Sequence, residues 1–242
     1  MKTLLKSLAI ILLFASCKTH NLLEKKVGTL DKAAFAYDDS YQYKIRKDDK
    51  ISLSVWGEDN LSVGSVYGIY NSNEVYGKWL LVDANGNIEV PRIGTKNVLD
   101  KTIPQLKEEL KNEFKKWLVT PVIDVKVLNK EITILGEVRN PNTFQVDKDK
   151  NYLLEMISKT GGFEFYANIK SIKILRQEGQ DVKITNIDLT NSDDILNTNV
   201  LLHPGDVVIV PSKKNKEFDK RISTVIPFAT TITAAAILMK AL

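Results

Sequence analysis

The residue with the clearest chemistry in this sequence is Cys17, the only cysteine among 242 residues. Lys2 and Lys6 precede an apolar run over residues 8–14, and the small pair Ala15-Ser16 comes directly before the cysteine. This order is typical of a bacterial secretory signal that ends in a lipobox, where the thiol accepts diacylglycerol and becomes the new N-terminus. We predict a signal peptide over residues 1–16 and lipidation at Cys17; the alternative is an ordinary signal peptide with an incidental cysteine. One cysteine excludes an intrachain disulfide and a Cys-based metal site.

Side chains that could catalyse a reaction are few and separated in the sequence. His20 falls in a polar segment, and His203 stands beside a Pro-Gly turn, where a surface position is more typical than a general base. Gly161-Gly162 follows a predicted helix instead of opening one, so it is a poor phosphate site. Asp193-Asp194 indicates a solvated turn, with a Ca²⁺ site as the alternative. We therefore expect no enzymatic activity, no cofactor and no metal centre.

Four aromatic residues are candidate contacts for a sugar polymer. Tyr67, Tyr70 and Tyr76, followed by Trp79, fall in or beside a stretch rich in Gly, Asn and Ser over residues 57–78, which predicts a long loop. Flat aromatic faces can stack on sugar rings, so these residues are possible glycan contacts. The alternative is that they pin the loop to its domain.

The C-terminal residues carry a second membrane signal. The segment from Ile222 to Met239 has no charge and reaches the lower length limit for a helix that crosses a bilayer. Its threonines and alanines make it only moderately apolar, so we expect it to pack with other helices; a buried core helix is the alternative. Residues 213–221, rich in lysine, predict an interfacial anchor. The predicted membrane-spanning side chains are Ile222, Val225, Ile226, Phe228, Ile232, Ile237, Leu238 and Met239.

Two α+β regions lie between these ends. In the first, Ile51, Leu53 and Val55 alternate with serines as in a half-buried strand, and a second alternating strand spans residues 123–127. Between them, Thr102 and Gln105 have capping-box spacing before a helix whose predicted apolar face comprises Leu106, Leu110, Phe114 and Trp117. A net charge of +4 without a concentrated basic face gives no support to nucleic-acid binding.

The second region begins directly after the first. An extended run from Ile132 to Leu135 is followed by a turn, a short helix over residues 152–159 and the glycine pair at 161–162. Strands are predicted at residues 169–175 and 182–187. An acidic turn at Gly205-Asp206 leads into a final apolar strand, which echoes Asp48-Asp49 before Ile51 and is a weak sign of an internal repeat.

Several blocks of these two regions match one family in order. Tyr43 to Trp56 and Val82 to Gly94 resemble the polysaccharide-export domain of the Wza-type outer-membrane polysaccharide export lipoproteins. Ile134 to Pro141, Leu153 to Gly162 and Leu202 to Pro211 resemble one soluble-ligand-binding β-grasp (SLBB) module. The sequence departs from the family in three ways. Lys47-Asp48-Asp49 replaces the usual Pro-Gly-Asp turn, and Asn142 stands where glycine is usual. Only one SLBB module fits where long members carry two, so the channel would be shorter or would depend on another protein.

The resemblance implies an α+β fold with a polysaccharide-export domain, one β-grasp-like SLBB domain and a C-terminal transmembrane helix. The predicted segments are the signal peptide 1–16, a tether 17–42, the export domain 43–129, the SLBB domain 130–212, and a basic linker with the spanning helix 213–242.

The resemblance also implies a function. It predicts an outer-membrane lipoprotein with periplasmic domains, which forms a homo-oligomeric, porin-like channel for capsular or extracellular polysaccharide. Its partners would be the polysaccharide substrate, outer membrane lipid and an inner-membrane polysaccharide co-polymerase or chain-length regulator, with no nucleic acid. The alternative is a periplasmic glycan-binding envelope lipoprotein that forms no pore.

Overall fold

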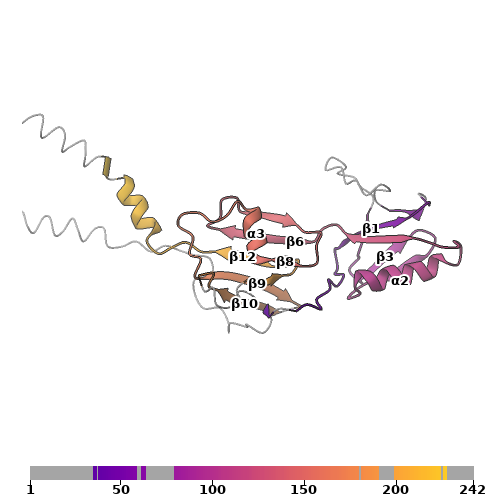
Figure 1. Cartoon of the computed structure of the whole chain (residues 1–242). Coiled ribbons are helices and arrows are strands. Elements are labelled where there is room, and N and C mark those ends of the chain that lie inside the picture. Colours follow the sequence, from indigo (N-terminus) through magenta and orange to yellow (C-terminus); the bar gives the residue numbers. More distant parts are fainter. Residues whose placement is uncertain are drawn as a thin grey trace, which may run out of the picture.

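The computed structural model describes residues 35–36, 38–58, 61–63, 79–179, 181–190, 199–224 and 226–227. These residues form two units that lie end to end, each built around its own hydrophobic core (Figure 1).

The first unit combines a small sheet, a hairpin and a helix. β1 (Lys50–Val55) lies at the centre of a three-stranded sheet, between β2 (Leu80–Leu81) and β5 (Ile123–Val127), and pairs antiparallel with both. β3 (Asn87–Val90) and β4 (Gly94–Asn97) form the separate hairpin. The predicted inward positions of β1 are confirmed, because Ile51, Leu53 and Val55 are almost completely buried. The predicted outward position of Ser52 is wrong, because this side chain is buried too.

The helix of the first unit, α2 (Ile103–Phe114), begins where the sequence predicts. The Thr102 side chain accepts a hydrogen bond from the Gln105 backbone N–H, and the Gln105 side chain accepts one from the Thr102 backbone N–H, so the capping box is present. The helix ends at Phe114, so Trp117 was wrongly included in the predicted apolar face. Trp117 lies beyond the helix and is about half exposed. The buried face comprises Leu106, Leu110 and Phe114.

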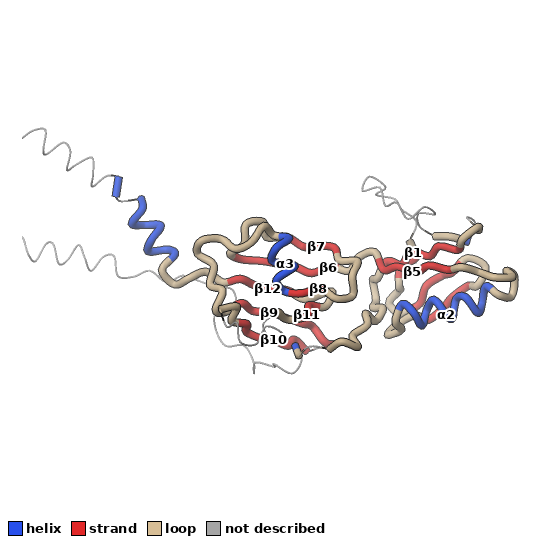
Figure 2. The backbone as a smooth tube through the Cα atoms, in the orientation of Figure 1, coloured by secondary structure: helices blue, strands red, loops and turns tan. Residues whose placement is uncertain are grey.

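The second unit is a five-stranded sheet. Its order is β10 (Asp181–Ile187), β9 (Ile172–Glu178), β12 (Val207–Val210), β6 (Glu131–Gly136) and β7 (Asn142–Gln145). The pair β12–β6 is parallel and the other pairs are antiparallel, so the last strand of the unit is inserted beside its first strand. Figure 2 shows this mixed sheet beside the smaller sheet of the first unit.

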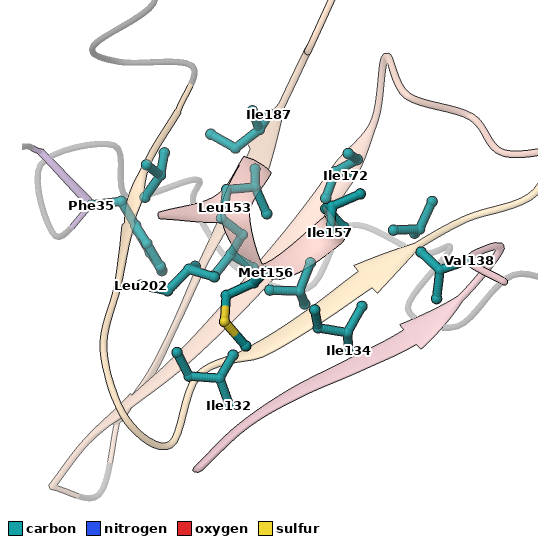
Figure 3. Packing of buried hydrophobic residues seen from close by; sticks show 14 of the residues in the cluster. Phe35, Ile132, Ile134, Val138, Leu153, Met156, Ile157, Ile172, Ile187 and Leu202 are labelled. Atoms are coloured by element: carbon teal, nitrogen blue, oxygen red, sulfur yellow. The ribbon is translucent and has the colours of Figure 1, made fainter. Parts of the chain in front are cut away.

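The core of the second unit lies between this sheet and a short helix. α3 (Leu153–Lys159) follows β8 (Asn151–Tyr152), which pairs with β11 (Leu201–Leu202). Residues from both layers meet in one cluster, where Met156 and Leu153 of the helix face the side chains of the sheet (Figure 3).

The N-terminal end of the described chain belongs to the core of the second unit. Phe35 is only 5% exposed and packs in that cluster, close to Leu202 in Figure 3. The chain then passes to the first unit, where Tyr43 is buried in the other core. The last part of the predicted tether is therefore packed against the second unit before the first unit begins.

The prediction of a C-terminal transmembrane helix is wrong in this structure. Within the described ranges, no helix combines the length and the apolar character that crossing a bilayer requires. The helical residues 216–224 are instead rich in charge, because Lys216, Glu217, Asp219, Lys220 and Arg221 all fall there. Ile222 is exposed on this helix, and Ile226 in the short described stretch 226–227 is exposed too; the other six predicted spanning residues, Val225, Phe228, Ile232, Ile237, Leu238 and Met239, lie outside the described residues.

Candidate functional site

Most of the predicted site residues lie outside the described ranges. Cys17, Tyr67, Tyr70 and Tyr76 lie outside the described residues, as do Asp193 and Asp194. Within the described ranges, no group of three or more His, Cys, Asp or Glu side chains could hold a metal ion. What the structure does place is the junction between the two units and the exposed surface at each far end.

Trp79 is the one predicted glycan contact that the structure describes. It precedes β2 and is 36% exposed, and the Lys50 Nζ lies 4.7 Å from the centre of its indole ring. Such a cation over an aromatic face fixes the ring and leaves part of it open to solvent. A role in glycan contact stays a prediction.

Two buried carboxylates give the junction its shape. Asp49 comes directly before β1 and Asp206 directly before β12, and each accepts a hydrogen bond at 2.8 Å from the backbone N–H three residues earlier, of Arg46 and of His203. The sequence echo between the two acidic turns is therefore a shared local structure. In both units it fixes the turn that starts a core strand.

The departure from the family turn is tolerated for a physical reason. Asp48 stands where glycine is usual, and its φ of 65° lies in the left-handed region, as does the φ of 93° at Gly205 in the second turn. Asp is one of the residues that enters this region at modest cost, because its short side chain can bond to nearby backbone. The turn is thus kept without glycine.

The Asp206 carboxylate also forms a buried ion pair with Arg176 of β9. The Arg176 Nε and Nη2 donate to the two carboxylate oxygens at 2.9 and 2.8 Å, and Nη2 also donates to the Leu201 carbonyl at 3.0 Å. The guanidinium lies 4.6 Å from the ring centre of Phe35. Burial raises the pKa of Asp206, and the hydrogen bonds from Arg176 oppose this rise. One cation therefore connects the N-terminal segment, β9 and the turn before β12.

Contacts across the junction join the two units. The Arg46 Nη1 donates to the Pro204 carbonyl at 3.0 Å, and its guanidinium lies 5.4 Å from the Tyr43 ring centre. The Tyr43 hydroxyl donates to Asp49 at 2.9 Å, and the Lys130 Nζ lies 5.6 Å from the same ring. Burial, followed by the Asp49 charge, raises the pKa of Tyr43. The turn of the second unit is thereby held against the start of the first.

Comparison with known proteins agrees with this two-unit arrangement. A family model described as "Polysaccharide biosynthesis/export protein" matches residues 38–128, and one described as "SLBB domain" matches residues 130–210. The two matches together cover most of the chain. The chain belongs to the polysaccharide export family. We refer below to its first unit as the export domain and to its second as the SLBB domain.

Two curated relatives are similar to this chain along most of its length. The EPS I polysaccharide export outer membrane protein EpsA of Ralstonia solanacearum is 28% identical over 204 residues, which are 76% of this chain and 53% of the relative. The protein of the same name from Ralstonia nicotianae is 25% identical over 188 residues, 72% of this chain and 49% of the relative. The chain spans about half the length of these curated relatives.

His203 belongs to the junction between the two domains, although its neighbouring turn suggested a surface position. Its ring stacks on Tyr41 with a centroid distance of 3.6 Å and an angle of 10° between the planes. Burial, and then the positive charges of Arg176 and Arg46, lowers the pKa of His203 to about 3, while Asp38 acts weakly in the opposite direction. The imidazole is therefore neutral at physiological pH, and its role is packing.

This neutral histidine predicts a loss of stability in acid. Because the pKa of His203 is about 3 in the folded protein and 6.5 ordinarily, its contribution is complete above pH 6.5 and is lost as the pH falls from 6.5 toward 3. His203→Phe keeps a stacked ring without a proton to bind. We expect the free energy of unfolding of the wild type to fall relative to this variant between pH 6.5 and 4, measured by urea denaturation at each pH. Parallel curves for the two proteins would show that His203 does not titrate in this way.

The far end of the export domain carries an exposed apolar surface, which we call the distal patch. Trp56 is 70% exposed at the end of β1, and its backbone N–H donates to the Val122 carbonyl at 2.9 Å, so the two residues are neighbours. Val122 belongs to the connection between α2 and β5, where Val119 is 96% exposed. Trp117, in the same connection, lies edge-on to Phe114. Large apolar side chains gathered at one end of a domain are typical of a surface that contacts another protein. Sequence reasoning missed this surface because it assigned Trp117 to the buried helix face.

Proposed function

We propose that this protein is an outer-membrane lipoprotein subunit of an oligomeric channel that exports capsular or extracellular polysaccharide. The observation that carries the proposal is the pair of matched domains, an export domain followed directly by an SLBB domain, in a chain that resembles relatives named polysaccharide export outer membrane proteins. Passage of a hydrated polymer requires a polar conduit held open and needs no catalytic group.

The size and rigidity of the chain support an assembly of several copies. In the described residues each domain is packed around a core of its own, and a ring of subunits related by rotation can enclose a passage for a polymer chain. A ring also requires that each subunit keep one shape. The contacts of Arg46 with Pro204 and of Tyr41 with His203 restrict bending between the two domains.

The predicted anchor limits where the domains can lie. Cys17 precedes Phe35, which is fixed in the SLBB core, by a segment that spans at most about 60 Å when fully extended. Lipidation of Cys17 would therefore keep the SLBB domain close to the membrane. We place the export domain, with its distal patch, on the side of the ring toward the inner-membrane co-polymerase or chain-length regulator. Crosslinking of the wild-type chain in cells, but not of a Trp56→Ser/Val119→Ser variant, to that inner-membrane protein tests this contact.

A complementation experiment tests the proposed function and the anchor together. In cells that lack this chain, the wild type is expected to restore surface polysaccharide. Cys17→Ala is expected to restore only a small fraction of it and to lose incorporation of labelled palmitate, because no thiol remains for the lipid. His20→Ala, nearby in the same segment, serves as the control and is expected to behave as wild type. Normal surface polysaccharide in cells without the chain would refute the export role.

The oligomeric state separates the channel from its alternative. Chains extracted in mild detergent are expected to form one discrete high-order oligomer, seen as rings by electron microscopy. A monomer that binds the polysaccharide would instead support the periplasmic glycan-binding lipoprotein, with Trp79 beside Lys50 as the place to test for sugar contact.

A further inference from the structure

The end of the SLBB domain remote from the export domain presents an aromatic residue next to a cluster of cations. Phe165, in the connection between α3 and β9, is 80% exposed. This connection lies against the chain that leaves β12: Ala167 forms a β-bridge with Ser212, and the Lys213 backbone N–H donates to the Tyr166 carbonyl at 2.8 Å. Figure 1 shows the C-terminal helix leaving the SLBB domain at the end opposite the export domain.

The exposed ring is held in place rather than loosely displayed. It lies edge-on to Tyr166, with centroids 5.1 Å apart and an angle of 88°. The Lys213 Nζ lies 5.6 Å from its centre and donates to the Phe165 carbonyl at 3.2 Å. An apolar side chain fixed in an exposed position by its neighbours is prepared for a contact outside the domain.

The charges around the ring favour an anionic partner. Residues 213–221 contain five basic side chains against two acidic ones, Glu217 and Asp219. The acidic residues beside Phe165 are Glu164, which is exposed, and Glu137, which is ion-paired with Lys216. Asp219 accepts a hydrogen bond from Asn215. With Glu164 and Glu137 included, five basic side chains stand against four acidic ones, so the balance on this surface is positive by one charge.

The helix that follows also combines exposed apolar side chains with basic ones. Phe218 and Ile222 are four residues apart within the described helical residues 216–224, so they lie on one face of the helix, and both are exposed. Ile226, a further four residues along the sequence, is exposed too. Lys220 and Arg221 lie between Phe218 and Ile222 in the sequence. An apolar helix face bordered by basic residues is typical of a segment that lies in the plane of a membrane interface.

We propose that Phe165, the adjacent Lys213 and the exposed helix face contact the headgroup layer of an anionic phospholipid bilayer. Phenylalanine would enter the boundary between headgroups and acyl chains, and the lysines would bind lipid phosphates. A lipid surface fits better than a second copy of this chain, because two copies would bring their positive clusters together. The proposal rests on the proposed function only in that the outer membrane supplies the bilayer.

Fluorescence quenching by brominated lipid tests this contact directly. The three native tryptophans all belong to the export domain, so Phe165→Trp adds a reporter at the opposite end of the molecule. The full chain is reconstituted into vesicles of dibrominated phosphatidylcholine and phosphatidylglycerol. We expect most of the fluorescence added by the substitution to be lost, and less of it to be lost when Lys213→Glu is combined with it or when phosphatidylglycerol is omitted.

Val182→Trp is the matched control, because Val182 is exposed at the end of β10 that faces the junction. Its added fluorescence is expected to remain. Equal quenching of the two reporters would overturn the proposal. Loss of access to aqueous iodide without quenching by bromine would also overturn it, because a protein neighbour would then cover Phe165. Restoration of export by Phe165→Trp would show that such a failure concerns the lipid contact and not the proposed function.

Discussion

Asp206→Ala is expected to lower the free energy of unfolding of the SLBB domain by about 3–5 kcal/mol. The variant leaves the buried Arg176 guanidinium without the carboxylate that accepts two of its hydrogen bonds. It also removes the acceptor of the His203 backbone N–H, so the turn that carries Pro204 to Arg46 is loosened. Hydrogen exchange of the β12 backbone amides in the full chain measures the loss for this domain alone.

Two further variants decide whether loss of the ion pair with Arg176 causes the expected destabilisation by Asp206→Ala. Asp188→Ala removes an exposed carboxylate of the same domain that bonds only locally to Thr190, and we expect a change within about 0.5 kcal/mol. The double variant Arg176→Met/Asp206→Leu exchanges the pair for apolar side chains and should recover most of the lost stability. A double variant that is as unstable as Asp206→Ala would show that the hydrogen bond to His203, and not the guanidinium, dominates.

Gly136→Ala is expected to destabilise the SLBB domain by about 2–6 kcal/mol, the sum of backbone strain and overpacking. Gly136 ends β6 with a φ of 95°, and it is paired with Val210 at the end of β12. A Cβ atom there would lie far inside van der Waals contact with the Val210 carbonyl oxygen, which accepts the Glu137 backbone N–H at 2.8 Å. The parallel pairing must therefore shift, and with it the chain that leads to the C-terminal helix. Export in the complementation assay should fall together with stability.

Gly162→Ala separates the clash from the backbone strain. Its φ of 93° is almost the same, but nothing lies within 4 Å of the Cβ position. We expect only the strain contribution, about 1–3 kcal/mol. The difference between the two variants in urea denaturation then measures the clash with Val210. Equal losses would mean that β12 yields to the added methyl group at no cost.

Much of the local structure could be predicted from the sequence because its causes lie within a few residues. The capping box of Thr102 and Gln105 fixes the start of α2, and the alternation of Ile51, Leu53 and Val55 fixes the buried face of β1. The order of motifs also predicted an export domain followed by an SLBB domain. The echo between the turns at Asp49 and Asp206 was visible in the sequence, although its physical meaning was not.

The prediction of a spanning helix at the C-terminal end is wrong within the described residues. Hydropathy alone assigned a spanning helix from Ile222, whereas the described helix begins among charged residues and presents Phe218 and Ile222 on one exposed face. Hydropathy averages over a window and does not register which face of a helix each residue occupies. The position of Phe165 beside Lys213 was equally invisible, because the two residues come from different connections of the fold.

The sequence by itself determined the family, the two domains and the local signals for turns, caps and strands, since these depend on neighbouring residues. Only the tertiary structure decided which distant side chains meet. It brings Phe35 into the SLBB core, stacks Tyr41 on His203, and carries Arg46 to Pro204 across the domain boundary. Contacts between such distant residues are selected by burial and charge pairing in the folded chain, and no periodicity along the sequence records them.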